Sequence, residues 1–265
     1  MAFSDWIAER FDLPVPHVPR LRDVSPEAAA EEIRLAWNLG NRRTPNMVHL
    51  LEAHGVRVFS LVEECAEVDA FSFWRDGVPF VFLNTMKSAE HSRMDAAHEL
   101  GHLVMHHWGG PGGRAAENQA KTFASAFLMP RQSILAQAPR GASIPAIVRA
   151  KHHWNVSAMA LAYRLRRLGL LSEWEARSVY IEMGKLGYRT NEPEEISRET
   201  SQVLAKVLSV VRNEGVTFSD IARDLSLPEE ELKKLVFGLA ITHFSGTRST
   251  SPRRPPLEVL PGGLS

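Results

Sequence analysis

Apolar residues at the start of the chain recur with a helical period. They fall every three or four positions from residue 26 to 40 and again from residue 44 to 55. A proline, Pro26 or Pro45, stands at the first helical position of each segment, where a backbone N–H is not needed. Each segment ends at a glycine. The pattern therefore predicts two amphipathic helices.

The period changes to two after residue 55, which is typical of strands. Residues 56–59 alternate, and residues 68–83 alternate on both sides of Asp76 and Gly77, a pair that favours a tight hairpin turn. Because Pro79 has no backbone N–H to donate, the second arm of the hairpin, 78–83, is predicted to be an edge or irregular strand. As an exposed edge, this arm would let an extended substrate add as a further strand.

Helical spacing returns at residue 88 and continues to residue 239. The helices predicted there are 88–108, 114–128, 144–154, 157–168, 172–184, 196–213, 217–225 and 228–239. No strand is predicted beyond residue 130. The order of elements predicts an α+β fold, because no strand–helix–strand alternation demands a parallel sheet.

Composition narrows the class of protein. At 265 residues, with 44% hydrophobic and 23% charged residues, the chain resembles an ordinary soluble protein with one enzyme-sized domain and a smaller companion. Neither a signal peptide nor a membrane span is expected, since no window approaches 18 apolar residues. The single Cys65 rules out an intrachain disulfide and a cysteine zinc site, and it suits the reducing cytoplasm, which is the predicted location.

The strongest chemical signal is an HExxH motif at His98, Glu99 and His102. On a helix, residues four apart lie about 40° from one another and about 6 Å along the axis, so both imidazoles can reach one ion. The glutamate between them points to the neighbouring side, where it can act on water at that ion. The motif predicts a metal site, with ordinary surface histidines as the alternative.

Catalytic zinc usually takes three protein ligands, so a third is expected. Glu117 is one candidate, because a glycine-rich turn would let its helix fold back on the first. His106 is the rival, but a span of about 12 Å along the axis from His98 is too long for one ion. His106 is therefore expected to cap or solvate the helix end. Asp95 either orients His98 or is an early-helix acid without function.

The residues around the motif resemble the ImmA/IrrE family of zinc metallopeptidases. The resemblance covers about residues 29–193. Its segments are Lys87-Ser88, Asp95 to Leu103, Glu117 to Pro130, Glu67 to Ser72, Phe82 to Thr85, and Trp154 to Ser157 continuing through Arg164 to Ser172.

Membership would imply a compact zincin-like catalytic domain with a small antiparallel sheet and an active-site helix. It would make His98, His102 and Glu117 ligands of Zn²⁺, with Mn²⁺ as a substitute, and Glu99 the general base. One position departs from the family: Lys121 stands where Asn or Asp is frequent. The best-known members cleave a helix-turn-helix repressor and so relieve transcriptional repression after stress, which implies a protein partner of that kind.

The predicted organisation has four parts. Residues 1–135 would form the metallopeptidase domain, 136–192 a helix-turn-helix-like extension, 193–244 a small helical module and 245–265 a disordered tail. In the module, three consecutive glutamates at 229–231 would repel DNA phosphate, which favours packing or protein interaction there.

Charge is distributed unevenly although Lys+Arg and Asp+Glu balance at 31 each. Residues 118–172 contain eight basic residues and no acidic ones. This stretch would serve as helical packing around the active site, as a face for an acidic protein substrate, or, less favoured, as a DNA contact through Arg164, Arg166 and Arg167. The leading hypothesis is a zinc endopeptidase; a non-proteolytic zinc-containing regulator and a DNA-binding regulator are the alternatives. Tyr163 and His107 are candidates for assisting at the oxyanion.

Overall fold

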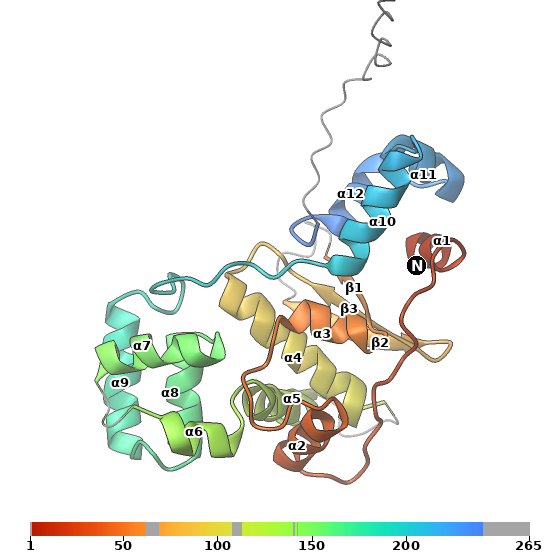
Figure 1. Cartoon of the computed structure of the whole chain (residues 1–265). Helices are drawn as coiled ribbons and strands as arrows, with labels where there is room; N and C mark the ends of the chain where they lie inside the picture. The colour runs from red at the N-terminus through yellow and green to blue at the C-terminus, as the bar shows by residue number, and fades with distance from the viewer. Residues whose placement is uncertain (1, 62–68, 108–112, 140, 142, 241–265) are drawn as a thin grey trace, which may run out of the picture.

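The computed structural model describes residues 2–61, 69–107, 113–139, 141 and 143–240 (Figure 1). These residues form helices and a single small sheet, so the predicted α+β class is confirmed. The helices of the first half are α1 (Ala2–Ala8), α2 (Pro26–Ala36), α3 (Met47–Ala53), α4 (Ala89–Met105), α5 (Gly113–Leu128) and α6 (Arg131–Gln137). Those of the second half are α7 (Ile144–Trp154), α8 (Ala158–Arg167), α9 (Glu173–Lys185), α10 (Gln202–Asn213), α11 (Phe218–Leu225) and α12 (Glu229–Val236).

The sheet has three strands in the order β1-β3-β2, and it is mixed. Its strands are β1 (Arg57–Ser60), β2 (Ala70–Arg75) and β3 (Val78–Leu83). β2 and β3 form the predicted antiparallel hairpin, with Asp76 and Gly77 at φ 51° and 78° in its turn, the left-handed region that a primed turn needs. The expectation of a fully antiparallel sheet is therefore wrong for one pair of strands. β1 pairs parallel with β3, because β2 lies between them in the sequence and runs opposite to both.

The predicted edge position of residues 78–83 is wrong, since β3 is the central strand. Pro79 is tolerated there because pairing with β1 starts one residue later, at the Arg57–Phe80 pair. On the other side Pro79 faces Trp74 of β2. The missing N–H of Pro79 therefore falls outside the β1 ladder. The strand with an open edge next to α4 is β2.

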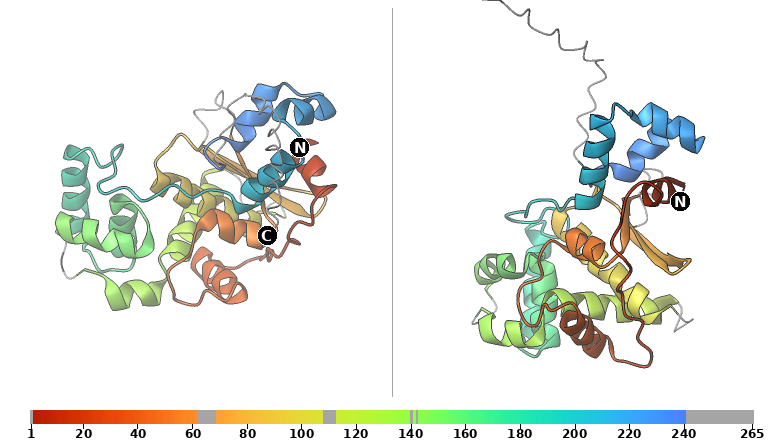
Figure 2. Two further views of the ribbon diagram at one scale, coloured as in Figure 1. Left: turned by 45° about the horizontal axis from the view of Figure 1, so that its top comes forward. Right: turned by 45° about the vertical axis from the view of Figure 1, so that its right-hand side comes forward.

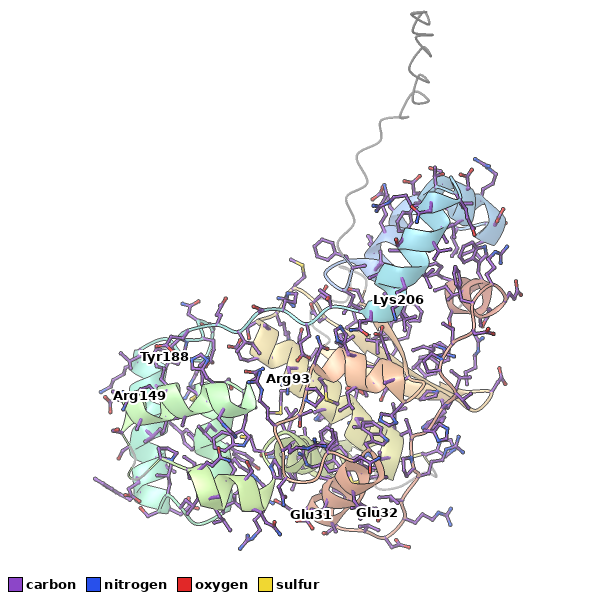
Figure 3. The ribbon with its side chains drawn as sticks, viewed as in Figure 1. Glu31, Glu32, Arg93, Arg149, Tyr188 and Lys206 are labelled. Carbon is purple, nitrogen blue, oxygen red and sulfur yellow. The ribbon has the colours of Figure 1, made fainter. Side chains whose placement is uncertain are left out.

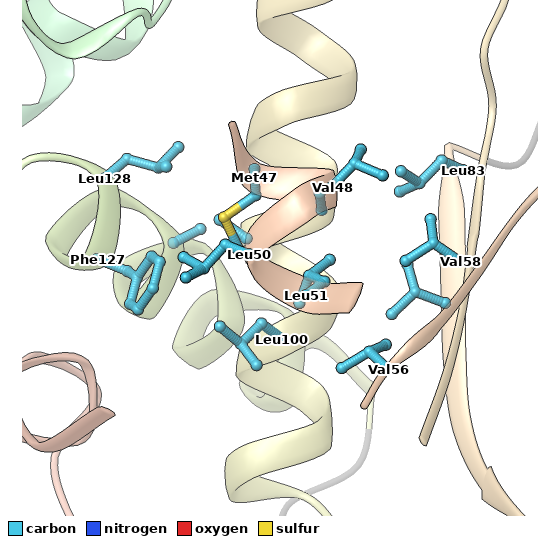
Figure 4. Packing of buried hydrophobic residues seen from close by; sticks show 14 of the residues in the cluster. Met47, Val48, Leu50, Leu51, Val56, Val58, Leu83, Leu100, Phe127 and Leu128 are labelled. Atoms are coloured by element: carbon cyan, nitrogen blue, oxygen red, sulfur yellow. The ribbon is translucent and has the colours of Figure 1, made fainter. Parts of the chain in front are cut away.

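The main core lies between one face of the sheet and the helices α3, α4 and α5. Figure 4 shows α3 in the centre of this core, between α5 on one side and β1 and β3 on the other. The buried side chains labelled there are Met47, Val48, Leu50, Leu51, Val56, Val58, Leu83, Leu100, Phe127 and Leu128. Burial of this apolar surface fixes α4 under the sheet, with its other face left for chemistry.

The opposite face of the sheet is aromatic and is covered by the two ends of the chain. Phe59 of β1 packs against Phe82 and against Phe3 of α1, with ring centroids 5.7 and 6.1 Å apart. α12 contacts β1, and α1 contacts α11 (Figure 1). Sequence patterns predicted neither α1 nor α6, which are both seven residues long.

Helices α6 to α9 form a separate helical lobe, and an extended segment, residues 188–201, leads from it back across the end of α4 to α10 (Figure 2). We call this segment the strap. In the lobe, the predicted pair 144–154 and 157–168 is present as α7 and α8. The pair packs through Val156, Leu161 and Leu165, which are all buried.

Buried ion pairs fasten the strap to the rest of the molecule. Arg93 of α4, labelled beneath the strap in Figure 3, pairs with Glu199 and donates to the carbonyl oxygens of Thr44 and Pro45. At the far end of the strap, Glu52 of α3 accepts hydrogen bonds from the Ser201 hydroxyl and from the first backbone amides of α10. A carboxylate at a helix N-terminus is favourable because it satisfies free N–H groups there.

No helix within the described parts of the chain combines the length and the apolar character that crossing a membrane requires.

Candidate metal centre

Helix α4 presents His98 and His102 on one face. The helix begins at Ser88, whose hydroxyl accepts the His91 amide, and it ends at His106, whose amide bonds to the carbonyl of His102. On its opposite face, Leu100, Leu103 and Val104 are buried in the main core under the sheet. Core packing on one side therefore turns the two imidazoles toward the open side, as the four-residue spacing predicts.

Helix α5 brings Glu117 to these histidines because it crosses α4 at close range. A side chain on Gly101 would lie 3.0 Å from the Phe123 ring and 3.3 Å from the Ala120 backbone. A side chain at Gly101 would therefore push the Phe123 ring or α5 outward, so glycine inside the motif favours the close α4–α5 crossing. Two turns of α5 before Phe123, Glu117 reaches across to the imidazoles, as predicted for the helix that follows the glycine-rich turn.

Three ligand atoms converge at this crossing. The Nε2 atoms of His98 and His102 are 3.1 Å apart, and the Glu117 carboxylate oxygens lie 3.1 Å from the first and 3.4 Å from the second. Tetrahedral ligands about 2.05 Å from a zinc ion would be about 3.3 Å from one another. The donor set of two imidazoles and one carboxylate and its spacing both fit a single divalent ion.

The electrostatics of the two imidazoles favour metal binding over protonation. Burial lowers the pKa of His98, while burial and the neighbouring His98 lower that of His102 to about 4. Neutral imidazoles are the form that binds a metal. Lys121, the position that departs from the family pattern, adds to the lowering at His98 through its positive charge.

Glu99 is held by the sheet. Its carboxylate Oε2 accepts a 2.6 Å hydrogen bond from the Ser72 hydroxyl of β2, which also lies 3.2 Å from the Glu99 carbonyl oxygen. Burial raises the pKa of Glu99 to about 7, against the lowering effect of the Ser72 hydrogen bond. A carboxylate with that pKa can take up and return a proton near neutral pH.

His106 continues the array of α4. Its Nδ1 lies 2.9 Å from Nδ1 of His102, and its Nε2 lies 2.9 Å from the Gln119 amide oxygen. This confirms its predicted place at the end of the helix. In addition, a proton on His102 Nδ1 donated to His106 would leave His102 Nε2 free for an ion, and Gln119 would fix the ring of His106.

Asp95 does not contact His98 among the described residues. It lies 3.6 Å from Nε2 of His91, and its Oδ2 is buried without a hydrogen-bond partner in the described part of the structure. Burial raises the pKa of Asp95 to about 7. Asp69 joins His91 and Asp95 in a second acidic group, but the Lys87 ammonium already pairs with Asp69.

The two candidates for assisting at the oxyanion lie in other packing environments. Tyr163 of α8 lies beside Arg166, whose guanidinium carbon is 5.8 Å from the centroid of the Tyr163 ring. His107 packs against Trp74 with ring centroids 5.3 Å apart. Neither residue belongs to the cluster of ligand atoms formed by the described residues.

The basic stretch does not form one continuous positive face. Arg164 is buried, pairs with Glu27 and donates to the carbonyl of Met129 at 2.9 Å. Lys151 is also fully buried, and Arg166 pairs with Glu173. Arg164 and Lys151 thus tie the lobe to α2 and α4, and the buried Arg164 has no access to a DNA phosphate.

The sequence analysis did not identify the Ser72 hydroxyl or the Gln119 amide as parts of the site. Ser72 lies 27 positions from Glu99, and only its place in the family-like hairpin singled it out at all. Gln119 is two residues from Glu117, but nothing in its surroundings distinguishes it from a solvated glutamine.

Comparison with known proteins agrees with this geometry. Residues 51–166 match the peptidase family described as the IrrE N-terminal-like domain. No curated protein matches the chain. The matched residues include β1 to β3, α4 and α5, and therefore all three converging ligand atoms. Residues 51–166 are thus similar to the IrrE N-terminal-like peptidase domain, which is consistent with the resemblance to the ImmA/IrrE family.

Proposed function

We propose that the protein is a zinc endopeptidase in which His98, His102 and Glu117 hold the ion and Glu99 is the general base. The observation that carries this proposal is the convergence of the two Nε2 atoms, 3.1 Å apart, with the Glu117 carboxylate, whose two oxygens lie 3.1 Å from His98 and 3.4 Å from His102. Zinc is preferred over manganese because two of the three donors are imidazole nitrogens. The activity is assigned to residues 1–135, with 136–192 and 193–244 as accessory helical parts.

When bound, the ion would supply Lewis-acid activation of water and of the scissile carbonyl. The chain's own residues handle the proton. Glu99, with a pKa near 7, accepts the proton of the attacking water and returns it to the leaving amine. Ser72 holds the Glu99 carboxylate through Oε2 and leaves Oε1 for this exchange. His106 and Gln119 keep the His102 ring in the orientation that directs Nε2 to the ligand cluster.

The open edge of β2 is the best place for an extended substrate. Ser72 of β2 contacts Glu99, and the Trp74 indole donates to the Leu103 carbonyl of α4, so this strand runs directly beside the active-site helix. β2 has no strand partner on its outer side among the described residues. A polypeptide that adds there would place a peptide bond next to Glu99 through main-chain hydrogen bonds alone.

The substrate class that the family resemblance suggests is a helix-turn-helix repressor, whose cleavage would relieve transcriptional repression in the cytoplasm. A repressor encoded beside this protein is the first substrate to test. Incubation of the purified, zinc-loaded protein with that repressor should produce two defined fragments, which mass spectrometry of the products would identify.

The deciding variant is Glu99→Gln. It removes the base but keeps all three ligands, so zinc content measured by atomic absorption should stay at one ion per chain while cleavage falls by at least about a hundredfold. His98→Ala is the matched variant that should lose both zinc and cleavage. Unchanged cleavage by Glu99→Gln would refute the mechanism, and binding of an intact repressor by the zinc-loaded native protein would favour a non-proteolytic regulator instead.

A further inference from the structure

A second cavity lies beside the N-terminal half of α4, between that helix, the start of α8 and the strap. Its volume is about 310 Å³. Met94 and Met159 supply apolar walls, Tyr188 stands at the strap end, and Glu90 and Glu192 supply carboxylates. Figure 3 labels Tyr188 where the strap leaves α9. The cavity combines apolar surface with acidic groups, which suits a long side chain with a charged end.

The carboxylates are built into the fold and are only partly satisfied. The fully buried Lys151 ammonium lies 3.1 Å from Oε1 of Glu90 and 3.0 Å from Oε1 of Glu192. The same two oxygens also accept the backbone amides of Ile196 and Ala158. Glu90 is 1% exposed, and its second oxygen, Oε2, has no hydrogen-bond partner among the described residues. A buried carboxylate oxygen without a donor is costly, so a donor is expected there.

The charges at this wall of the cavity do not balance. Two buried carboxylates face one buried ammonium, so this buried cluster has one negative charge in excess when both acids are ionised. Burial raises the pKa of Glu192, and the charge of Glu90 raises it further, as expected for an uncompensated acid. Arg189 lines the outer part of the cavity but is exposed, and its guanidinium lies against Gly184 of α9. One added cation with N–H donors would satisfy both the charge and the free oxygen.

We propose that this cavity is a subsite for one arginine or lysine side chain of the protein substrate. The aliphatic stem would lie between Met94 and Met159, and the cationic end would donate to Glu90 and Glu192. The inference rests on the proposed peptidase function, because it makes the cavity part of the same substrate cleft.

The position of the cavity along α4 indicates which substrate residue it takes. His91, at the cavity, precedes His98 by seven residues, about 10.5 Å along the helix. An extended chain covers that length in about three residues. β2 runs in the same direction as α4, since Ser72 lies at Glu99 and Trp74 at Leu103. A substrate antiparallel to β2 would therefore place its second or third residue after the scissile bond in the cavity.

The binding test uses the full chain and two small probes. N-acetyl-argininamide carries the proposed side chain, and N-acetyl-norleucinamide is a neutral compound with a similar stem. In protein labelled with ¹³C at the methionine methyl groups, the Met94 and Met159 signals should shift in a saturable way with the arginine probe only. Equal shifts with the neutral probe, or no shift at millimolar arginine probe, would overturn the proposal.

Variants separate the subsite from a general effect of the strap. Glu192→Gln should weaken binding of the arginine probe about tenfold, as expected for loss of a charge-assisted hydrogen bond. Glu194→Gln is the matched control, since Glu194 lies on the strap, pairs with His152 and does not line the cavity. Met159→Arg, which adds a cation from the cavity wall, should abolish probe binding in a protein that still unfolds cooperatively. Retained probe binding in that variant, or equal weakening by Glu194→Gln, would contradict the subsite.

A cleavage test distinguishes failure of the subsite from failure of the peptidase proposal. Digestion of a mixed peptide library by the zinc-loaded protein should enrich arginine and lysine two or three residues after the cut. Cleavage without that enrichment would overturn the subsite and leave the peptidase proposal intact. A library that stays intact, together with saturable binding of the arginine probe, would refute the peptidase proposal and uphold the cation site.

Discussion

The hydroxyl of Ser72 lies 2.6 Å from the carboxylate of Glu99, so a residue of the outer strand β2 directly holds the proposed general base on α4. The contact joins the strand on which the substrate would lie to the group that would act on water. The same hydroxyl also donates to the Glu99 carbonyl oxygen at 3.2 Å, so Ser72 fastens β2 to the α4 backbone as well.

Replacement of Ser72 by alanine should lower kcat about tenfold and leave zinc affinity unchanged. The Ser72 hydrogen bond lowers the pKa of Glu99, so its loss should move the acidic limb of the pH–rate profile to higher pH. Steady-state kinetics over pH 5–9 would measure both effects. Ser72→Thr, which keeps a hydroxyl, should behave like the native protein, and an unshifted profile in Ser72→Ala would argue against a positioning role.

Loss of the His106 imidazole should weaken zinc binding without removing a ligand. His106→Ala deprives His102 of its partner at Nδ1, and such outer partners of ligating histidines are worth about 10- to 100-fold in metal affinity. Competition with a chromogenic chelator would measure the Kd for zinc. Gln119→Leu should show a smaller loss in the same direction, whereas His152→Ala on the exposed side of α7 should show none.

Asp95 should make the metal-free protein less stable as pH rises. Its folded-state pKa of about 7 exceeds 3.8, the ordinary value for an aspartate, so between these values the folded protein holds a proton that the unfolded chain releases. Stability from this group is complete below pH 4 and declines as pH rises to about 7. The Asp95→Asn side chain cannot ionise. The unfolding free energy of this variant should therefore rise relative to that of the native protein across this window, by about 4 kcal/mol in total. Urea unfolding at pH 4.5 and pH 8 would compare the two, and parallel pH dependences would refute the assignment.

The arginines of α8 should divide into structural and surface groups. Arg164→Ala leaves Glu27 without its partner and removes the donor to Met129, and it should cost about 3 kcal/mol of unfolding free energy. Arg167→Ala, at an exposed position of the same helix, should change stability by less than about 0.5 kcal/mol. If Arg167→Ala also left salt-dependent retention on a DNA column unchanged, the alternative of a DNA-binding regulator would lose its remaining support.

Much of the candidate metal site on α4 could be predicted because its geometry is local. A four-residue spacing fixes the angle between His98 and His102 on any α-helix, and the structure places both side chains together as expected. Glu117 depended on a fold-back of the next helix, for which the glycine-rich turn and the family resemblance were the signals. The close crossing itself follows from Gly101, whose steric role becomes visible only with Phe123 beside it.

Contacts between distant segments were beyond prediction. A charge count treats Lys151 and Arg167 alike, although Lys151 is buried between two glutamates and Arg167 is exposed. Pro79 does lack a backbone N–H to donate, as the prediction assumed. The strand can nevertheless be central because β1 pairs with it only from Phe80 onward, and local periodicity does not specify where that pairing starts. Long-range pairings of this kind arise from tertiary packing rather than from local preference.

The cover that α12 gives to the sheet has a consequence for biosynthesis. All three strands of the sheet have been made once the ribosome reaches residue 83. The helix α12, which covers β1, is the last described helix of the chain and is made much later. At about 5–20 residues per second, a ribosome needs on the order of ten seconds to bridge that interval. During that interval the aromatic face of the sheet has only α1 as a cover, so we expect the nascent chain to expose apolar surface to chaperones until α12 has been made.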